Sequence, residues 1–96
     1  MQVDFSSVRN YYEQVVFREV AEKATARGGD SVSPDALLDV ACVALNRLPP
    51  RYIRHDADFY FFLTEQERAD NDTAISEAID YAFGFVLSRR AARLKG

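Results

Sequence analysis

The sequence predicts a mainly α-helical fold of three long helices with a short β segment around residues 58–63, assembled as a homodimer. Two stretches, at about residues 10–27 and 73–94, carry apolar residues at helical spacing. Between them, residues 34–47 are apolar on almost every side. Residues 59–63 are continuously aromatic or aliphatic, which favours a strand. The chain has 96 residues, and 48% of them are hydrophobic. We therefore expect residues 1–96 to form one globular domain.

The first helix is expected to span about residues 10–27. Asn10 and Glu13 have the spacing of a capping box, in which each side chain bonds a backbone N–H at the helix start. Gly28 and Gly29 should end the helix. Its apolar residues recur every three or four positions: Tyr12, Val15, Val16, Val20, Ala21 and Ala24.

The second helix has a strong start signal in Ser33-Pro34-Asp35, which places a hydroxyl at the N-cap, a proline at the first helical position and an acid in the first turn. It is expected to run to about Arg47 and to lie at the centre of the core. Cys42 is the one cysteine, so it can form no intrachain disulfide, and we expect it to be a small buried hydrophobic residue.

A rigid elbow follows this helix at Leu48-Pro49-Pro50. Proline fixes its own φ and disfavours the α region for the residue before it, so the chain must leave the helix and run extended. Asn46 is expected to close the helix, either in the left-handed conformation or by bonding a free carbonyl group. Arg47 and Arg51 then lie at opposite ends of a stiff turn.

The last helix is expected from about residue 73 to 94, capped by Asn71 and Asp72, although Thr64 and Glu67 offer an earlier cap. It has a main apolar stripe around Ile75, Ile79 and Phe83, and a second one beside it. One core could cover both stripes; we favour a symmetric homodimer, because a glycine within a helix is explained by close helix packing. The expected interface residues are Phe59, Phe61, Tyr81, Gly84 and Phe85.

Charge is segregated along the chain, whose net charge is −3. Residues 47–55 contain arginines and no acid, residues 56–80 are strongly acidic, and residues 89–95 are basic. The net charge argues against a general nucleic-acid-binding protein. Three arginines so close together repel one another unless an anion or the acidic segment faces them, and pairing with that segment could account for all three.

The sequence offers little support for other classes of protein. It has no glycine-rich phosphate loop and no nucleophile–base arrangement, so we expect no enzyme. A single histidine and a single cysteine cannot build a metal site of the usual kind, so no metal is expected. No apolar run approaches the roughly 18 residues of a membrane span and no signal peptide is evident, so we expect a cytoplasmic protein with no membrane insertion.

Residues 39–52 carry a specific pattern: Asp39, an apolar helix, then Leu45-Asn46-Arg47-Leu48-Pro49-Pro50-Arg51-Tyr52. This pattern resembles the signature of the late competence development family ComFB, in which Leu-Asn-x-Leu-Pro-Pro-x-Tyr follows a helix. Asn10-Tyr11-Tyr12-Glu13 with Val16 is similar to the first-helix pattern of that family, so the resemblance covers most of the chain.

The resemblance implies a small, helical, dimeric regulator without catalytic activity. Some members resemble zinc proteins, with cysteines where this chain has Ser33 and Ala36, so zinc is not expected here. ComFB-like domains are also recognised as receptors for cyclic di-GMP, which the resemblance therefore implies as the ligand. We also expect a protein partner that receives the signal, which the resemblance does not identify. The alternative is a ligand-free protein–protein adaptor of the competence or surface-motility type.

The elbow has the chemistry that a cyclic dinucleotide requires, because guanidinium groups bind phosphates or guanine edges and flat rings stack on bases. We expect Arg51 and Arg54 to be the main contacts, with Tyr52 or His55 stacking. Tyr52 could instead pack in the core, and His55 could be an ordinary surface residue. The full set of expected ligand-binding residues is Arg47, Arg51, Tyr52, Arg54, His55, Asp56 and Asp58.

Overall fold

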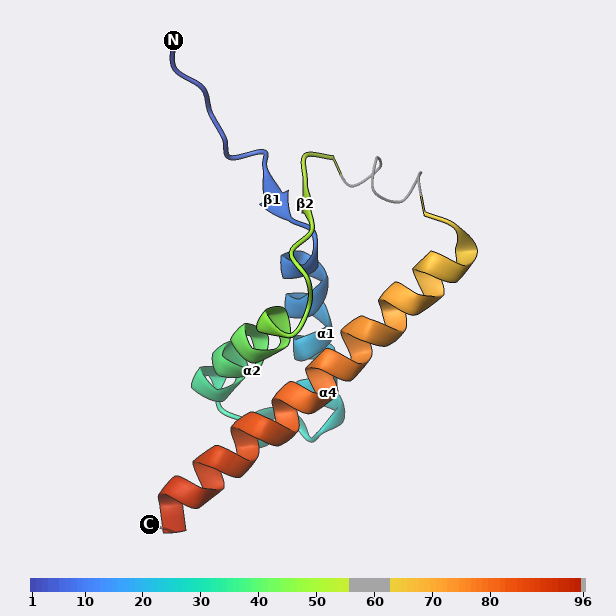
Figure 1. The fold of residues 1–96 in the computed structure, drawn as a ribbon. Helices are drawn as coiled ribbons and strands as arrows, with labels where there is room; N and C mark the ends of the chain where they lie inside the picture. The colour runs from blue at the N-terminus through green and yellow to red at the C-terminus, as the bar shows by residue number, and fades with distance from the viewer. Residues whose placement is uncertain (56–62, 96) are drawn as a thin grey trace.

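A computed structural model describes residues 1–55 and 63–95. The described chain consists mainly of α1 (Tyr12–Ala26), α2 (Pro34–Asn46) and α4 (Glu65–Lys95). A 3-10 turn, η1 (Gly29–Ser31), joins α1 to α2, and two short strands, β1 (Arg9–Asn10) and β2 (Tyr52–Ile53), complete it. Helices α1 and α2 lie against the same long helix, α4, which crosses the whole molecule (Figure 1). The prediction of a mainly helical fold is confirmed.

Helix α1 begins at Tyr12, and Asn10 helps to start it without forming the expected capping box. Asn10 lies one residue before the N-cap, Tyr11, and its Oδ1 accepts from the backbone N–H of Tyr12 at 3.2 Å. The same oxygen accepts from the backbone N–H of Arg51 at 3.1 Å. Gly28 ends the helix as expected, with a φ of 105° that disfavours other residues.

Helix α2 begins as its sequence predicts. Ser33 is the N-cap, its side chain accepts from the backbone N–H of Ala36 at 3.2 Å, and Pro34 is the first helical residue. The helix ends at Asn46 and is capped by Arg47 in the right-handed region. No described residue other than glycine has a positive φ, so of the two alternatives for Asn46 the left-handed conformation is wrong.

Helix α2 contributes to the core as expected, but it is not buried on every side where it is apolar. Val40 and Ala44 are fully buried, whereas Leu38 is 67% exposed and Cys42 is exposed. The reason is that α1 and α4 cover only part of the helix surface and leave the side that carries Leu38 and Cys42 uncovered. Cys42 is therefore a free surface thiol and not a core residue.

Helix α4 begins at Glu65, about eight residues before the predicted start. Thr64 Oγ1 accepts from the backbone N–H of Glu67 at 3.1 Å, which confirms the earlier of the two possible caps. Asn71 caps nothing, because it lies within the helix and its Oδ1 accepts from the hydroxyl of Tyr12 at 2.7 Å. At 1.5 Å per residue the helix is about 46 Å long, close to the 52 Å maximum extent of the molecule.

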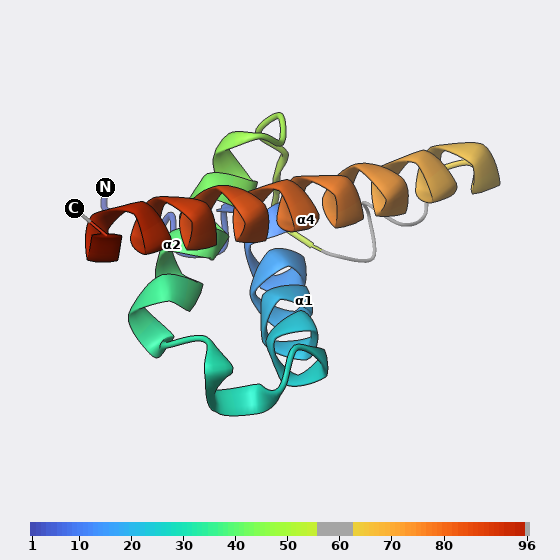
Figure 2. The ribbon, with the colours of Figure 1, turned by 90° about the horizontal axis from the view of Figure 1, so that it is seen from below.

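The core lies where α1 and α2 pack against the middle of α4 (Figure 2). Its largest fully buried side chains come from all three helices: Val16, Val40, Ile75, Ile79 and Phe83. At its edge, Lys23 Nζ pairs with Asp80 at 2.6 Å and donates to Ser76 Oγ at 3.1 Å, which ties α1 to α4. Burial of the main apolar stripe of α4 is therefore confirmed.

The two strands form a short antiparallel pair that the sequence analysis did not predict. Arg9 lies opposite Ile53, and Asn10 lies opposite Tyr52. One further bond, from the backbone N–H of Tyr11 to the carbonyl of Arg51 at 2.7 Å, extends this pairing toward α1. The strand predicted around residues 58–63 lies outside the described residues, except Leu63, which belongs to no strand.

Candidate functional site

The elbow of residues 47–55 is held at its start by Leu48 and further along at residues 51–53. Leu48 is 8% exposed and anchors the start of the elbow in the core, while Pro49 and Pro50 are exposed. Asn10 binds the backbone of Arg51, and β1 pairs with β2. The proline pair and these bonds together fix the path of the chain.

Beyond the prolines, the elbow presents aromatic and cationic groups to solvent. Tyr52 is 69% exposed, so the alternative that it packs in the core is wrong. Arg51, Arg54 and His55 are also exposed. Four of the predicted ligand-binding residues therefore lie together on one accessible segment. Asp56 and Asp58, the remaining acids of the prediction, lie outside the described residues.

Arg51 faces the acidic part of α4. It lines a groove of about 410 Å³ together with Tyr12, Pro49, Glu67 and Asp70. Two carboxylates of the acidic segment therefore share the groove with Arg51, as the alternative of pairing with that segment requires.

Arg47 lies apart from this groove and contacts an aromatic ring. Its guanidinium carbon is 3.8 Å from the ring centre of Tyr81, a cation–π contact. Tyr81 stacks on Phe85 with ring centres 5.9 Å apart, and Arg89 lies 4.9 Å from the centre of the Phe85 ring. These four residues form what we call the cation–aromatic row. The structure thus divides the predicted arginines between two places.

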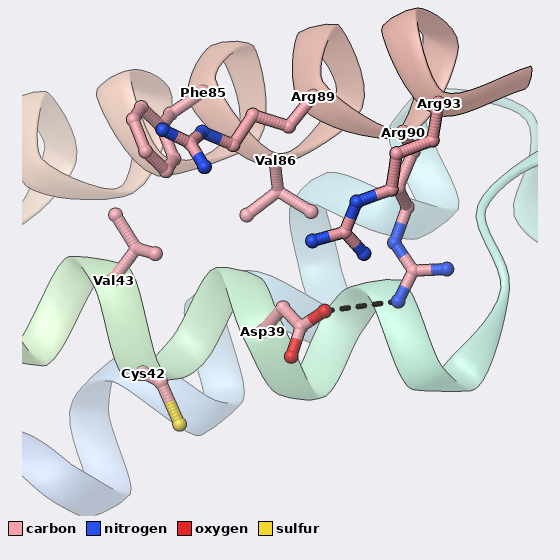
Figure 3. Close-up of a pocket in the computed structure, with 8 residues that line it drawn as sticks. All are labelled: Asp39, Cys42, Val43, Phe85, Val86, Arg89, Arg90 and Arg93. Carbon is pink, nitrogen blue, oxygen red and sulfur yellow. Dashed lines mark hydrogen bonds and ion pairs between the residues drawn. The ribbon is translucent and has the colours of Figure 1, made fainter. Parts of the chain in front are cut away.

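The row leads into a cavity of about 300 Å³ between α2 and the C-terminal half of α4 (Figure 3). Arg90 pairs there with Asp39 at 2.9 Å, while Arg89 extends over Phe85 and Cys42 points away from α4. The sequence analysis noted that residues 89–95 are basic but did not predict that their arginines line a cavity. The lining residues are Asp39, Cys42, Val43, Phe85, Val86, Arg89, Arg90 and Arg93.

The residues expected at a dimer interface are exposed in the single chain wherever they are described. Tyr81 is 44% and Phe85 38% exposed, so the core of one chain leaves these two residues of the second stripe uncovered, although it buries Ala78. Gly84 is exposed, and a Cβ added to it would meet no atom within 4 Å. No contact within the described chain therefore explains this glycine. Phe59 and Phe61 lie outside the described residues.

A second uncovered surface is an apolar groove between α1 and α2 that the sequence analysis missed. Phe17 is 46% and Leu38 67% exposed, and they line a groove of about 190 Å³ with Ala21, Leu37 and Ala41. Its lining is almost wholly apolar. The sequence analysis missed it because α2, apolar on almost every side, was expected to lie at the centre of the core.

Two features are absent from residues 1–55 and 63–95. No three histidine, cysteine, aspartate or glutamate side chains gather there as metal ligands would. Within the same residues, no helix combines the length and the apolar character needed to cross a bilayer.

Comparison with known proteins gives one clear result. The model of a family described as late competence development protein ComFB matches residues 9–90, a range that runs from β1 through the elbow and most of α4. The chain matches no curated protein.

Proposed function

This chain belongs to the ComFB family, and on that premise we propose that it is a dimeric, non-enzymatic receptor for cyclic di-GMP that passes its ligand state to a protein partner. Family resemblance suggests the ligand. One observation carries the proposal to these residues: Tyr52 stands 69% exposed on β2, between the exposed Arg51 and Arg54. An exposed aromatic ring flanked by guanidinium groups suits a ligand that offers both bases and phosphates.

The ligand has two phosphate charges and two guanine bases. Arginine forks bind phosphate oxygens, or the O6 and N7 atoms of guanine, through two parallel hydrogen bonds. Stacking of a base on an aromatic ring contributes about 1–3 kcal/mol. We assign the arginine contacts to Arg51 and Arg54 and the stacking to Tyr52 or His55. Asp56 or Asp58 would accept from the N1 and N2 edge of guanine.

The ligand must compete with the acids that share the groove of Arg51. Glu67 and Asp70 lower the local potential, which opposes the approach of an anion. Arg54 is exposed and does not line that groove, so it should contribute more to affinity than Arg51.

Dimerisation through α4 is part of the proposal. The exposure of Tyr81, Gly84 and Phe85 supports it, because an exposed pair of aromatic side chains on a helix favours burial by a partner. A two-fold symmetric dimer would also present two elbows to a ligand that has two-fold symmetry of its own.

Thermal unfolding with and without ligand tests this function. Ligand at about 100 times its dissociation constant adds roughly 2.7 kcal/mol of stability, which should raise the melting temperature by several degrees or more in a domain of this size. Cyclic di-AMP and GTP serve as controls. No shift with saturating cyclic di-GMP would overturn the receptor proposal.

Variants then test the assigned residues. Arg54→Ala and Arg51→Ala should each weaken binding without unfolding the protein, because only the backbone of Arg51 takes part in the bonds to Asn10 and Tyr11. Arg18→Ala, at an exposed position on α1, is the matched control and should bind like the wild type. An unchanged affinity in either elbow variant would show that the assignment of that arginine is wrong.

The ligand-free adaptor is the second candidate, and the apolar groove between α1 and α2 favours it. Phe17 and Leu38 offer a surface on which an amphipathic segment of another protein could bury apolar side chains. A ligand titration separates the two functions. If cyclic di-GMP gives no shift while the fold is intact, the adaptor is the function that this surface supports.

A further inference from the structure

The cavity between α2 and the C-terminal half of α4 has an excess of positive charge, and we call it the arginine cavity. Its charged lining residues are Arg89, Arg90, Arg93 and Asp39, so three guanidinium groups face one carboxylate. The side chains of Arg90 and Arg93 both extend from α4 toward α2 (Figure 3). Helix α4 contains no acid after Asp80. The arginine cavity is therefore suited to an anionic ligand.

The pair of Arg90 and Asp39 leaves hydrogen-bond donors of Arg90 unused. One Nη atom of Arg90 donates to one carboxylate oxygen of Asp39 at 2.9 Å, whereas arginine binds an oxyanion best through two parallel bonds. The Nε atom of Arg90 is buried and has no hydrogen-bond partner in the described part of the chain. A buried N–H without an acceptor is unfavourable. Because the side chain as a whole is 37% exposed, it has room to turn toward an oxyanion from outside the chain.

The other two arginines of the cavity have no carboxylate partner within residues 1–55 and 63–95. Arg89 and Arg93 are four positions apart, so they lie on one face of α4 about 6 Å apart along its axis. Like charges at this spacing destabilise a helix. The helix dipole does not explain Arg89, because it favours cations within the last turn and Arg89 lies more than one turn before the end at Lys95. Two negative groups about one helical turn apart would relieve this repulsion.

The remaining surface of the cavity is partly apolar. Val86 is buried and Val43 half-buried, and both lie in the space between α2 and α4 (Figure 3). A free inorganic anion gains nothing from these side chains, whereas a peptide with both acidic and apolar side chains would contact all of the lining. A nucleic acid fits less well, because the acidic half of the same helix would repel a long polyanion. Asp39 shows that a carboxylate is accepted beside these arginines.

We propose that the arginine cavity is the docking site for an acidic segment of a partner protein, which rests on the protein partner of the proposed function and defines its chemistry. Two carboxylates of that segment, about one helical turn apart, bind Arg89 and Arg93. An apolar side chain of the segment packs against Val43 and Val86. None of these four residues belongs to the proposed dimer interface.

The arginine cavity is separate from the elbow but connected to it by side chains in contact. The cation–aromatic row runs from Arg47, in the elbow, to Arg89, in the cavity. Neither Arg51 nor Arg54 lines the cavity. Cyclic di-GMP and the partner segment would therefore bind at the same time, and the row provides a path of contacts between the two sites.

NMR titration of the isotope-labelled protein with a synthetic peptide tests the docking site. The probe is an alanine-rich helical peptide of about 16 residues, with two glutamates four positions apart and a leucine one turn from them. The Nε–H signals of Arg89, Arg90 and Arg93 and the backbone signal of Val43 should shift in a saturable way, because the peptide then occupies the cavity. The same peptide with glutamine in place of both glutamates is the control and should leave these signals unchanged.

Variants assign the contacts. The double variant Arg89→Gln/Arg93→Gln should weaken the peptide about tenfold, as expected from two exposed ion pairs. Arg18→Gln, at an exposed position on α1, is the matched control and should bind like the wild type. Asp39→Asn should tighten binding about threefold, because it removes the carboxylate that competes for Arg90. Unchanged binding in the double variant, or weaker binding in Asp39→Asn, would overturn the docking site.

Three further results would also contradict it. The first is no shift of the arginine signals at millimolar peptide, and the second is an equal shift with the glutamine peptide. The third is tighter binding of inorganic phosphate or a short DNA duplex than of the acidic peptide, which would assign the cavity to phosphate groups.

The same variants separate the docking site from the receptor function. The double variant Arg89→Gln/Arg93→Gln should bind cyclic di-GMP like the wild type, because neither arginine belongs to the elbow. If it lost that affinity, the dinucleotide would occupy the cavity and the docking site would be wrong. Wild-type protein that binds the peptide but not cyclic di-GMP would overturn the receptor proposal alone, and the converse result would overturn the docking site alone.

Discussion

Replacing Asn10 with alanine should destabilise the fold and loosen the elbow together. The side-chain oxygen of Asn10 accepts from the N–H of Tyr12 at 3.2 Å and from the N–H of Arg51 at 3.1 Å. It therefore joins the start of α1 to the segment that carries the proposed ligand contacts. Apart from the bond between Tyr11 and Arg51 and the pairing of β1 with the two-residue β2, this is the link that the described residues offer the elbow.

The expected loss follows from these two bonds. Each contributes about 1 kcal/mol net, and the N–H of Tyr12 loses its side-chain partner in a half-buried place. The free energy of unfolding should fall by about 2 kcal/mol. In a domain of this size, that loss lowers the melting temperature by about 8–16 °C. Affinity for cyclic di-GMP should fall as well, since the backbone of Arg51 is less well held.

Chemical and thermal unfolding of Asn10→Ala provide the measurement, and Asn10→Asp is the control. Aspartate keeps the acceptor oxygen and places a negative charge near the start of α1, so its stability should stay close to that of the wild type. The free energy of unfolding of the alanine variant could lie within about 0.5 kcal/mol of the wild-type value, a difference smaller than the usual contribution of one hydrogen bond. That result would show that Asn10 does not link the helix to the elbow.

Three further predictions concern α2, α4 and the groove. Ser33→Ala should reduce stability by about 1 kcal/mol in urea unfolding, because it removes the N-cap bond. Tyr12→Phe should reduce it by a similar amount, since the hydroxyl bond to Asn71 ties α4 to α1. Asp70→Asn should raise the calorimetric affinity for cyclic di-GMP, because it removes a negative charge from the groove of Arg51.

Each of these three has a clear contrary result. Ser33→Thr retains a capping hydroxyl, so a loss equal to that of the alanine variant would exclude the cap as the cause. Unchanged unfolding of Tyr12→Phe would mean that the contact with Asn71 contributes nothing. A weaker affinity in Asp70→Asn would show that this carboxylate assists the ligand and does not oppose it.

Local signals in the sequence predicted the helices well. Ser33 and Pro34 start α2, Gly28 ends α1, and both features depend on residues next to the helix end. The start of α4 was misplaced because Asn71 resembles a cap. Its side chain instead accepts a hydrogen bond from the hydroxyl of Tyr12, which lies 59 positions away in the sequence. Only folding brings these two residues together.

The site was predictable in composition but not in arrangement. The exposed Tyr52 and its neighbouring arginines follow from the proline elbow, whose backbone is stiff. The contact of Arg47 with Tyr81 depends on how α2 crosses α4, and no local pattern encodes that crossing. The exposure of Cys42 and Leu38 was missed for a related reason: an apolar helix is fully buried only if enough elements pack around it, and in the described part of the chain α1 and α4 pack against α2.

The most direct test of the central claim is isothermal titration of the purified wild-type protein with cyclic di-GMP, with cyclic di-AMP as the comparison. The account predicts saturable binding of cyclic di-GMP that weakens with added salt, because arginines meet phosphates. It also predicts a marked loss of affinity in Arg54→Ala. No heat of binding at ligand concentrations well above physiological levels, from protein shown to be folded, would contradict the claim that this chain is a cyclic di-GMP receptor.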